Sequence, residues 1–350
     1  MRVLFLSTPF DARTHLDGSR RAIADLLPAL VLNGVTPTVL VRAGELAPGG
    51  GRTFVVRGND RAEAALAAGL AEVDLIHAWF APRTPTAALL HLVRRVRGIP
   101  IVQTVASVPR SMFSVGSTLA GDVIVPTSDA TAIALATAGV DARRMARIPS
   151  PFLFTGDRVL SPAASVGVVG VPRDLLIYAG DWEFDDGIER TLHAFARMAA
   201  PRGVTPHLAI ASRGKTKRAA EIEQKIRKRI ADTVVLRDRV TILGELPSLL
   251  PFIAGARGVL VPASNTFAKL DHPRVLLEAI ALGVRIVVGT APSLAELVDD
   301  ARVGEIARDN GELREAMERC FSEPPPPPAV IARLLSPRQP EPIAARYAQI

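Results

Sequence analysis

Short apolar runs alternate with amphipathic stretches along most of the chain, and this alternation is what most constrains its fold. Short runs bounded by Gly, Pro or polar residues indicate buried strands, and the longer amphipathic stretches between them indicate helices. Parallel strands need such crossovers, because the chain must return to the same end of the sheet before each new strand. The sequence therefore predicts the α/β class, with parallel sheets covered by helices on both faces.

The strand–helix units form two series. The first runs from "RVLFLS" (2–7) to "DATAIALATAG" (129–139), and the second from "LLIYAG" (175–180) to "SLAELVDD" (293–300). Between them, residues 150–174 are rich in Pro, Gly and Ser, which is typical of a linker. A chain of 350 residues is also too long for one ordinary core. We expect two doubly wound, Rossmann-like domains.

The expected domain limits are 1–155 and 170–320. After the second series, "EPPPPP" at 323–328 predicts a stiff polyproline spacer. Residues 329–350 are then expected to pack back on the N-terminal domain. In doubly wound sheets ligands bind outside the carboxyl ends of the strands, so the cleft between the domains is the expected site.

Composition limits the partners. The formal net charge of +7 favours anionic ones, but only 5% of residues are aromatic and no basic–aromatic alternation occurs, so we expect no nucleic-acid partner. The single cysteine, Cys320, and the absence of Cys/His clusters predict neither a disulfide nor a metal site. The start, "MRVLFLSTPF", suits a first strand better than a signal peptide. We expect a cytoplasmic protein.

A basic run, "KTKRAAEIEQKIRKR" at 215–229, has two interpretations. It is either a solvated helix face or a surface attracted to anionic lipid headgroups, which would allow peripheral contact with the inner membrane face.

The stretch "KLDHPRVLLEAIALGVRIVVG" (269–289) predicts a helix that carries one carboxylate, Glu278, among apolar residues. A buried carboxylate is costly unless it has hydrogen-bond donors or an opposite charge. A structural explanation is an ion pair with Arg274, four residues earlier on the same helix face.

The order and spacing of several segments resemble the retaining nucleotide-sugar glycosyltransferases of the GT-B fold, in glycosyltransferase family four (group 1 type). The resemblance extends to about residue 300 and lies in "MRVLFLS", "DGSRRAIADLLPALVLNG", "VDLIHAWF", "IVQTV", "DVIVPTSDATAIALATAGVDARRMARIPSP", "LLIYAGDWEFDDGIERTLHAF", "RVTILGELPSLLPFIAGARGVLVPA" and "VLLEAIALGVRIVV". It implies an N-terminal acceptor domain and a C-terminal donor domain. The implied reaction transfers a sugar, with retention and without metal or other cofactor, from a nucleotide-diphosphate sugar to an unidentified glycan, lipid-linked sugar or small molecule.

The resemblance also implies roles for residues. Glu278 matches the glutamate that accepts hydrogen bonds from the ribose hydroxyls, while the family's other glutamate falls on Leu270. Asp271 is then expected to bind the donor sugar and Lys269 a phosphate oxygen. The alternative is that Asp271 caps the following helix and Lys269 is solvated. Gly18 and Gly180 are expected near the donor phosphates.

Two departures leave the activity open. Asp181 and Asp186 stand where the family has a basic pair that neutralises the diphosphate, so Arg213 and Lys215 are candidates to replace it; a solvated loop would explain these two equally well. A further departure is the missing first-domain histidine, replaced by Ala106. His77 is the candidate on the acceptor side, or else a core histidine. A catalytically silent sugar-nucleotide-binding or partner protein of the same fold is the alternative function.

Overall fold

The computed structural model describes residues 1–12, 14, 17–57, 67–79, 84–109, 115–155, 174–200, 202–246, 248–267 and 269–350. The chain divides into two compact units. The first contains Met1–Leu153, Phe267–Asp271 and Ser336–Ile350, and the second contains Phe154–Thr266 and His272–Leu335. Most of the expected linker, residues 156–173, lies outside the described residues.

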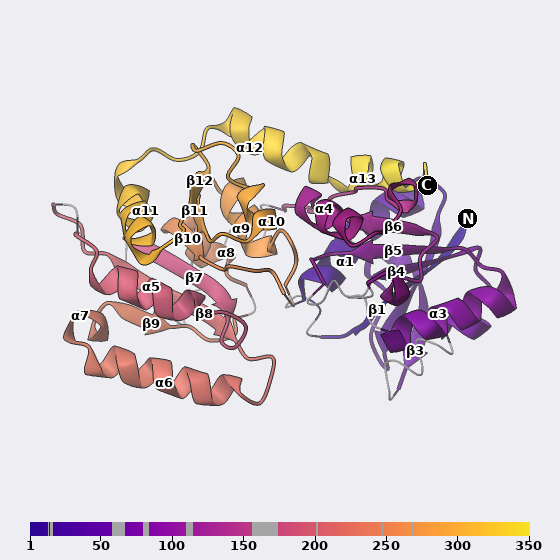
Figure 1. Ribbon diagram of the computed structural model, residues 1–350, viewed down its shortest axis with the longest axis horizontal. Coiled ribbons are helices and arrows are strands. Elements are labelled where there is room, and N and C mark those ends of the chain that lie inside the picture. The colour runs from indigo at the N-terminus through magenta and orange to yellow at the C-terminus, as the bar shows by residue number, and fades with distance from the viewer. Residues whose placement is uncertain are drawn as a thin grey trace. The chain divides into compact units, whose positions relative to one another are not determined.

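The first unit is built on a six-stranded parallel sheet of order β3-β2-β1-β4-β5-β6 (Figure 1). Its strands are β1 (Arg2–Phe10), β2 (Thr36–Arg42), β3 (Arg52–Val56), β4 (Leu75–Trp79), β5 (Ile101–Val105) and β6 (Val123–Pro126). The chain winds outward from β1 in one direction and then from β4 in the other. The point between β1 and β4 is therefore the switch point at which doubly wound sheets bind ligands.

The second unit repeats this winding in a six-stranded sheet of order β12-β11-β10-β7-β8-β9. Its strands are β7 (Leu175–Asp181), β8 (His207–Arg213), β9 (Val240–Ile242), β10 (Ala256–Val261), β11 (Arg285–Val288) and β12 (Gly304–Ile306). Its switch point lies between β7 and β10. All strand pairs in both sheets are parallel.

Helices accompany the strands in both units. Those of the first unit are α1 (Gly18–Leu32), α3 (Thr84–Arg97), α4 (Asp129–Thr137) and α13 (Pro340–Tyr347). Those of the second are α5 (Gly187–Ala196), α6 (Ala219–Asp232), α7 (Val234–Arg237), α8 (Leu250–Ala254), α9 (Arg274–Ala281), α10 (Pro292–Ala295), α11 (Asn310–Ser322) and α12 (Pro328–Leu335). Among the described residues, no helix combines the length and apolar character that crossing a bilayer requires.

Local sequence explains where helices begin and end. The Asp17 side chain caps α1 by accepting hydrogen bonds from the Ser19 and Arg20 amides, and Gly34 follows the helix with φ 77°. Ser128 caps α4 in the same way, accepting from the Thr131 amide.

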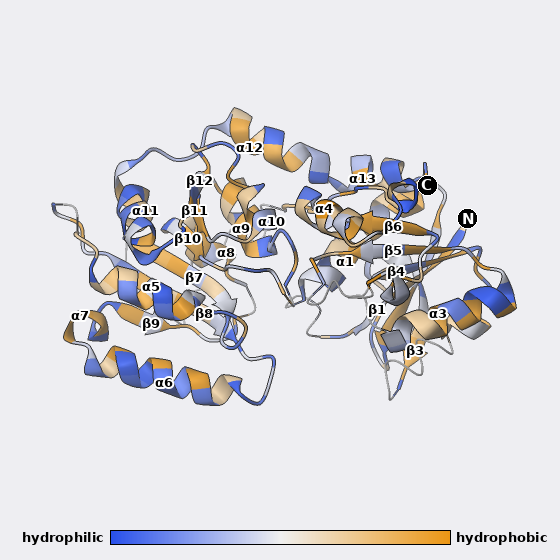
Figure 2. Cartoon of the chain, in the orientation of Figure 1, coloured by the Kyte–Doolittle hydropathy of each residue, from blue (hydrophilic) through white to orange (hydrophobic). Residues whose placement is uncertain are grey.

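The cores lie between the sheets and these helices. Figure 2 shows mainly hydrophobic strands in both sheets, whereas α6 alternates hydrophobic and hydrophilic residues as a half-exposed helix should. In the first unit α13 packs on α1, and its Ile343 and Ala344 join the core formed with Phe5 and Ile23. Helix α12 packs on α9 in the second unit.

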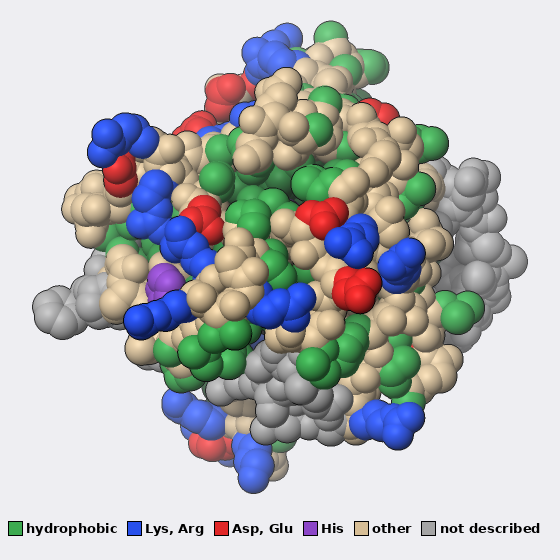
Figure 3. Space-filling model, turned by 90° about the vertical axis from the view of Figure 1, so that its right-hand side faces the viewer, with side chains coloured by type: hydrophobic (Ala, Val, Ile, Leu, Met, Phe, Trp, Pro, Cys, Tyr) green, Lys and Arg blue, Asp and Glu red, His purple; other side chains and the backbone are tan. Residues whose placement is uncertain are grey.

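The surface carries both signs of charge. On the face drawn in Figure 3, Lys and Arg side chains are interspersed with acidic and apolar ones. The basic run on α6 is similarly paired: Lys225 contacts Glu221 at 2.8 Å, and Arg227 contacts Glu223 at 2.6 Å, each one turn apart. These contacts are those expected of a solvated helix face.

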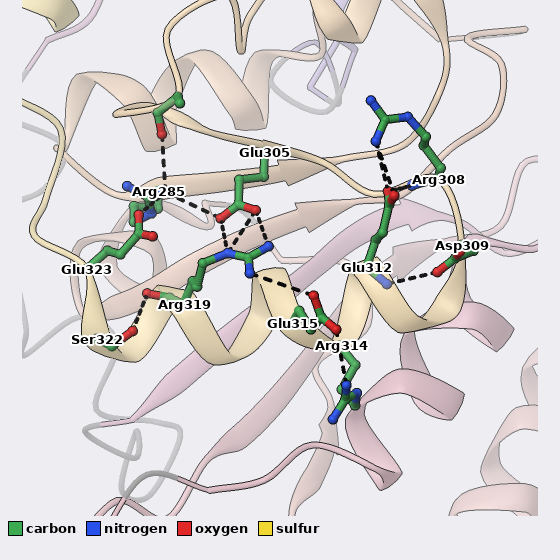
Figure 4. A network of polar contacts seen from close by, with 11 residues as sticks. Arg285, Glu305, Arg308, Asp309, Glu312, Arg314, Glu315, Arg319, Ser322 and Glu323 are labelled. Carbon is green, nitrogen blue, oxygen red and sulfur yellow. Dashed lines mark hydrogen bonds and ion pairs between the residues drawn. The ribbon is translucent and has the colours of Figure 1, made fainter.

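A network of ion pairs joins β11, β12 and α11 in the second unit (Figure 4). Arg285 of β11 is 5% exposed and pairs with Glu323 and, at 3.6 Å, with Glu305 of β12. Glu305 also accepts hydrogen bonds from Arg319 of α11, whose pKa is raised mainly by this contact. The network thus holds the last strand of the sheet to the helix that follows it.

The predicted fold class is confirmed, because each unit contains a doubly wound parallel sheet flanked by helices. The tail expected at 329–350 is divided between the units. Its first part, α12, belongs to the second unit, and residues from Ser336 onward belong to the first.

Candidate functional site

The carboxyl end of β7, at the switch point of the second unit, carries Gly180 and Asp181. A Cβ atom on Gly180 would lie 2.6 Å from the Tyr178 hydroxyl oxygen, so glycine is needed there to make room for that side chain. Burial, and then the nearby charges of Asp185, Asp181 and Asp186, raises the pKa of Tyr178 well above its usual value. Packing alone thus explains Gly180, and the hydroxyl beneath it stays protonated.

Asp181 is 4% exposed and is neutralised by the two basic residues at the end of the neighbouring strand. Its Oδ2 lies 3.0 Å from Lys215 Nζ, and its Oδ1 lies 3.7 Å from Arg213 Nε. The Lys215 and Thr216 amides both donate to Glu183 Oε1, at 2.8 and 2.6 Å. Two cations therefore surround one buried carboxylate. The loop after β8, which carries Lys215, is also hydrogen-bonded to the loop after β7, which carries Glu183.

Glu278 lies on α9, which begins after β10 in the same unit, and is 9% exposed. Its Oε1 accepts a hydrogen bond from Arg274 Nε at 3.1 Å, one helical turn earlier. This is the ion pair given above as the structural explanation of Glu278. It supplies an opposite charge to the buried carboxylate.

A second polar pair, in which the histidine is buried, lies beside α9. His272 is 1% exposed, and its Nε2 lies 3.2 Å from Glu296 Oε2, just after α10. Sequence reasoning missed Glu296, because it lies 24 residues from its partner and has no distinctive motif around it.

Asp271 belongs to the first unit. Its Oδ2 accepts hydrogen bonds from the hydroxyls of Ser128 and Thr131, both at 2.6 Å, and Thr127, at 3.3 Å. Its amide donates to the Ala106 carbonyl at 2.8 Å. The alternative in which Asp271 caps the following helix is wrong: the N-cap of α9 is Pro273, and no side chain caps it.

The rest of this turn lies in the first unit as well. A Cβ on Gly18, at the start of α1, would lie 2.7 Å from Leu270 Cδ1, so the two are in close contact. Lys269 is half-buried. The basic start of α1 is paired internally, because Arg20 Nη1 donates to Asp11 at 2.6 Å and to the Pro9 carbonyl at 2.8 Å.

His77 lies in the middle of β4 and is 3% exposed. Its Nε2 is 2.7 Å from Thr104 Oγ1, and its ring lies 4.9 Å from that of Tyr347. Burial lowers its pKa to about 3, so the ring is neutral at physiological pH. This position argues against contact with an acceptor and corresponds to the core histidine considered as the other interpretation.

Metal sites are also absent from the described part of the chain, where no group of three or more His, Cys, Asp or Glu side chains could hold an ion.

Comparison with known proteins adds a family match to part of the chain and a shared fold. Residues 173–323 match the family described as "Glycosyl transferases group 1". None of the curated proteins compared with this chain matches it.

Solved structures share the fold over the whole chain. The Anabaena protein HepE, in complex with UDP and glucose, is 16% identical, with a TM-score of 0.77 over 100% of this chain and 98% of its own. Sucrose-phosphate synthase from Thermosynechococcus elongatus is 17% identical, with a TM-score of 0.77 over 99% of this chain and 97% of its own. A glycosyltransferase from Rickettsia africae is 13% identical, with a TM-score of 0.75 over 99% and 97%. The family match thus covers residues 173–323, and the solved structures show that this chain shares their fold.

Proposed function

We propose that this chain is a glycosyltransferase that moves a sugar from a nucleotide-diphosphate donor to an acceptor with retention of anomeric configuration. The observation that carries the proposal is the family match at 173–323, because it covers most of the unit that contains Asp181, Arg213, Lys215 and Glu278. HepE, which has the same fold, binds UDP and glucose. In this proposal the second unit binds the donor and the first binds the acceptor.

In this reaction the second unit must neutralise the negative charge of the diphosphate leaving group. Arg213 and Lys215 together carry one positive charge more than Asp181, and they would offer it to the more strongly negative diphosphate in charge-assisted hydrogen bonds. Glu278 would accept hydrogen bonds from the ribose hydroxyls beside its contact with Arg274. Lys269 would contact a phosphate oxygen.

The proposed reaction breaks the bond between the anomeric carbon and the diphosphate oxygen and forms one from the same face to the acceptor oxygen. The departing diphosphate takes the acceptor proton, so the mechanism assigns no side chain as general base. Groups that stabilise charge developing on the leaving group contribute most to such a step.

A ligand panel tests the proposal. Thermal unfolding is measured with uridine, guanosine, adenosine and thymidine diphosphates and with the corresponding nucleotide sugars. We expect the ligands that carry one of these bases to raise the melting temperature, with an effect that saturates as the ligand concentration rises. Replacing Arg213 and Lys215 by Ala should weaken binding of that diphosphate more than binding of its nucleoside. Lys225→Ala, which removes an exposed α6 ion pair, is the control. No stabilisation by any nucleotide would refute the proposal.

A catalytically silent sugar-nucleotide-binding protein is the second candidate. It is favoured by the pairing of both Arg213 and Lys215 with Asp181, which lowers the charge that they can offer to a diphosphate. Incubation with the bound nucleotide sugar and candidate acceptors separates the two. An enzyme gives a glycoside whose anomeric proton coupling reports retention, whereas a silent protein returns the donor unchanged.

A further inference from the structure

Three separate contacts fix residues 269–271 to one edge of the first sheet. The Asp271 amide donates to the Ala106 carbonyl just after β5, and its carboxylate accepts from hydroxyls that follow β6. Leu270 contacts Gly18, at the start of the helix that follows β1. Because all these strands are parallel, the contacts lie at the same carboxyl edge of the sheet.

The carboxylate and the hydroxyls depend on each other. Ser128 Oγ accepts a hydrogen bond from the Thr131 amide at 3.0 Å as the cap of α4, and donates its own proton to Asp271 Oδ2. Asp271 is 0% exposed, so its charge needs these donors in place of water. The N-terminal end of α4 also favours a negative charge at this point.

We propose that Asp271 is a positioning residue, which fixes the turn carrying Lys269 to the carboxyl edge of the first sheet, and that it acts through the Thr127, Ser128 and Thr131 hydroxyls rather than by touching the donor sugar. One oxygen of Asp271 accepts all three of these bonds, which is the arrangement of an anchor. Lys269, two residues earlier, is the charged residue that this anchoring would hold for a donor phosphate. This last consequence rests on the proposed function, whereas the anchoring itself does not.

Hydrogen exchange without ligand tests the anchoring. The variants are Asp271→Ala and the double variant Ser128→Ala with Thr131→Val. Thr137→Val is the control, because Thr137 lies on the same helix and its hydroxyl donates to the Ile133 carbonyl one turn earlier. We expect exchange in residues 266–273 to rise about tenfold or more in both test variants and to stay unchanged in the control. Unchanged exchange in the double variant overturns the proposal even if Asp271→Ala fails to fold.

Donor kinetics then separate an anchor from a sugar ligand. Asp271→Asn keeps one oxygen acceptor for the three hydroxyls but loses the charge. We expect it to keep the donor kcat/KM within about threefold, while Asp271→Ala and the double variant both lose about thirtyfold, mainly in KM. Adding Lys269→Ala to Asp271→Ala or to the double variant should lower the donor kcat/KM little further, because each of these variants already acts by displacing Lys269. The proposal is overturned if Asp271→Asn is as impaired as Asp271→Ala while the double variant is normal.

The two proposals fail differently. If wild-type protein neither binds nor turns over any nucleotide sugar, the proposed function is wrong, and the exchange result still decides the anchoring. If the donor is turned over but exchange is unaffected by loss of the hydroxyls, only the anchoring is wrong.

Discussion

His77 shows how burial decides what a residue can do. A histidine at the end of a strand near a switch point is a reasonable acceptor contact, but this one lies inside the sheet, bonded to Thr104 and covered by Tyr347. The neutral ring is the form that such a site tolerates, because burial penalises the charged form.

Acid should therefore destabilise the protein through His77. The unfolded chain takes up this proton near pH 6.5, whereas folded His77 takes it up only near pH 3. As far as this group is concerned, the free energy of unfolding is highest above pH 6.5 and falls as the pH is lowered from 6.5 toward 3. The fall between pH 7 and pH 5 is about 2 kcal/mol. Urea unfolding at pH 7 and pH 5 should show this loss of unfolding free energy. In His77→Gln the loss between the two pH values should be smaller by the part that His77 contributes. His91→Gln, at an exposed position on α3, should retain the full loss.

Glu278→Gln tests the ribose contact in the proposed function. An amide offers one oxygen acceptor where the carboxylate offers two, so nucleotide affinity should fall by roughly ten- to hundredfold. The melting temperature should fall as well, because Arg274 loses its charged partner. If the contact with Arg274 is the only role of Glu278, calorimetric titration will instead give unchanged affinity for a variant with a lower melting temperature.

Among the elements, β12 and α11 depend on the Arg285 ion pairs. Arg285→Ala would leave Glu305 and Glu323 without this partner, and the Glu305 side chain is only 23% exposed. We expect a loss of about 2–3 kcal/mol in unfolding free energy, somewhat below the range for a fully buried pair. Arg308→Ala, which breaks the more exposed pair with Glu312 in the same network, should cost much less in the same urea titration. Equal losses would contradict this account.

The elements themselves could be predicted well from sequence, and their side-chain partners much less so. Apolar runs such as "LLIYAG" are strands because burial on both faces of a parallel sheet requires continuous apolar residues. The Gly34 helix end and the Ser128 cap follow from local backbone chemistry. The partners of Asp271, by contrast, lie at least 140 residues away. No local pattern distinguishes a carboxylate that caps the helix following it from a carboxylate that is hydrogen-bonded to a helix elsewhere in the sequence.

The site of the second unit could be predicted in part for the same reason. Arg213 and Lys215 could be named because they follow a strand whose carboxyl end should lie at the ligand-binding edge. Their pairing with Asp181 depends on β8 lying next to β7, a strand order that the sequence pattern leaves open. The sequence therefore predicts that Arg213 and Lys215 lie at this edge of the sheet, but not that Asp181 pairs with both.

At the scale of the whole molecule, each unit contains one of the chain's two tryptophans. Trp79 packs in the core of the first unit and Trp182 in that of the second. Single-tryptophan variants, Trp182→Phe and Trp79→Phe, can therefore report on the units separately. Removing residues 340–350 should lower the urea midpoint seen by Trp79, because Ile343 and Tyr347 would no longer cover its core. The midpoint seen by Trp182 should move much less, and an equal shift of both would show that the units unfold together.

The discontinuity of the first unit has a consequence for the order of events during synthesis. Its segments Met1–Leu153 and Ser336–Ile350 are separated by nearly the entire second unit. At about 5–20 residues per second, a ribosome needs roughly ten to forty seconds to cover that distance. Throughout this interval the nascent sheet that contains His77 and Trp79 lacks α13, and the apolar surface that α13 will cover is open to chaperones. The part of the chain made first is thus among the last to be completed.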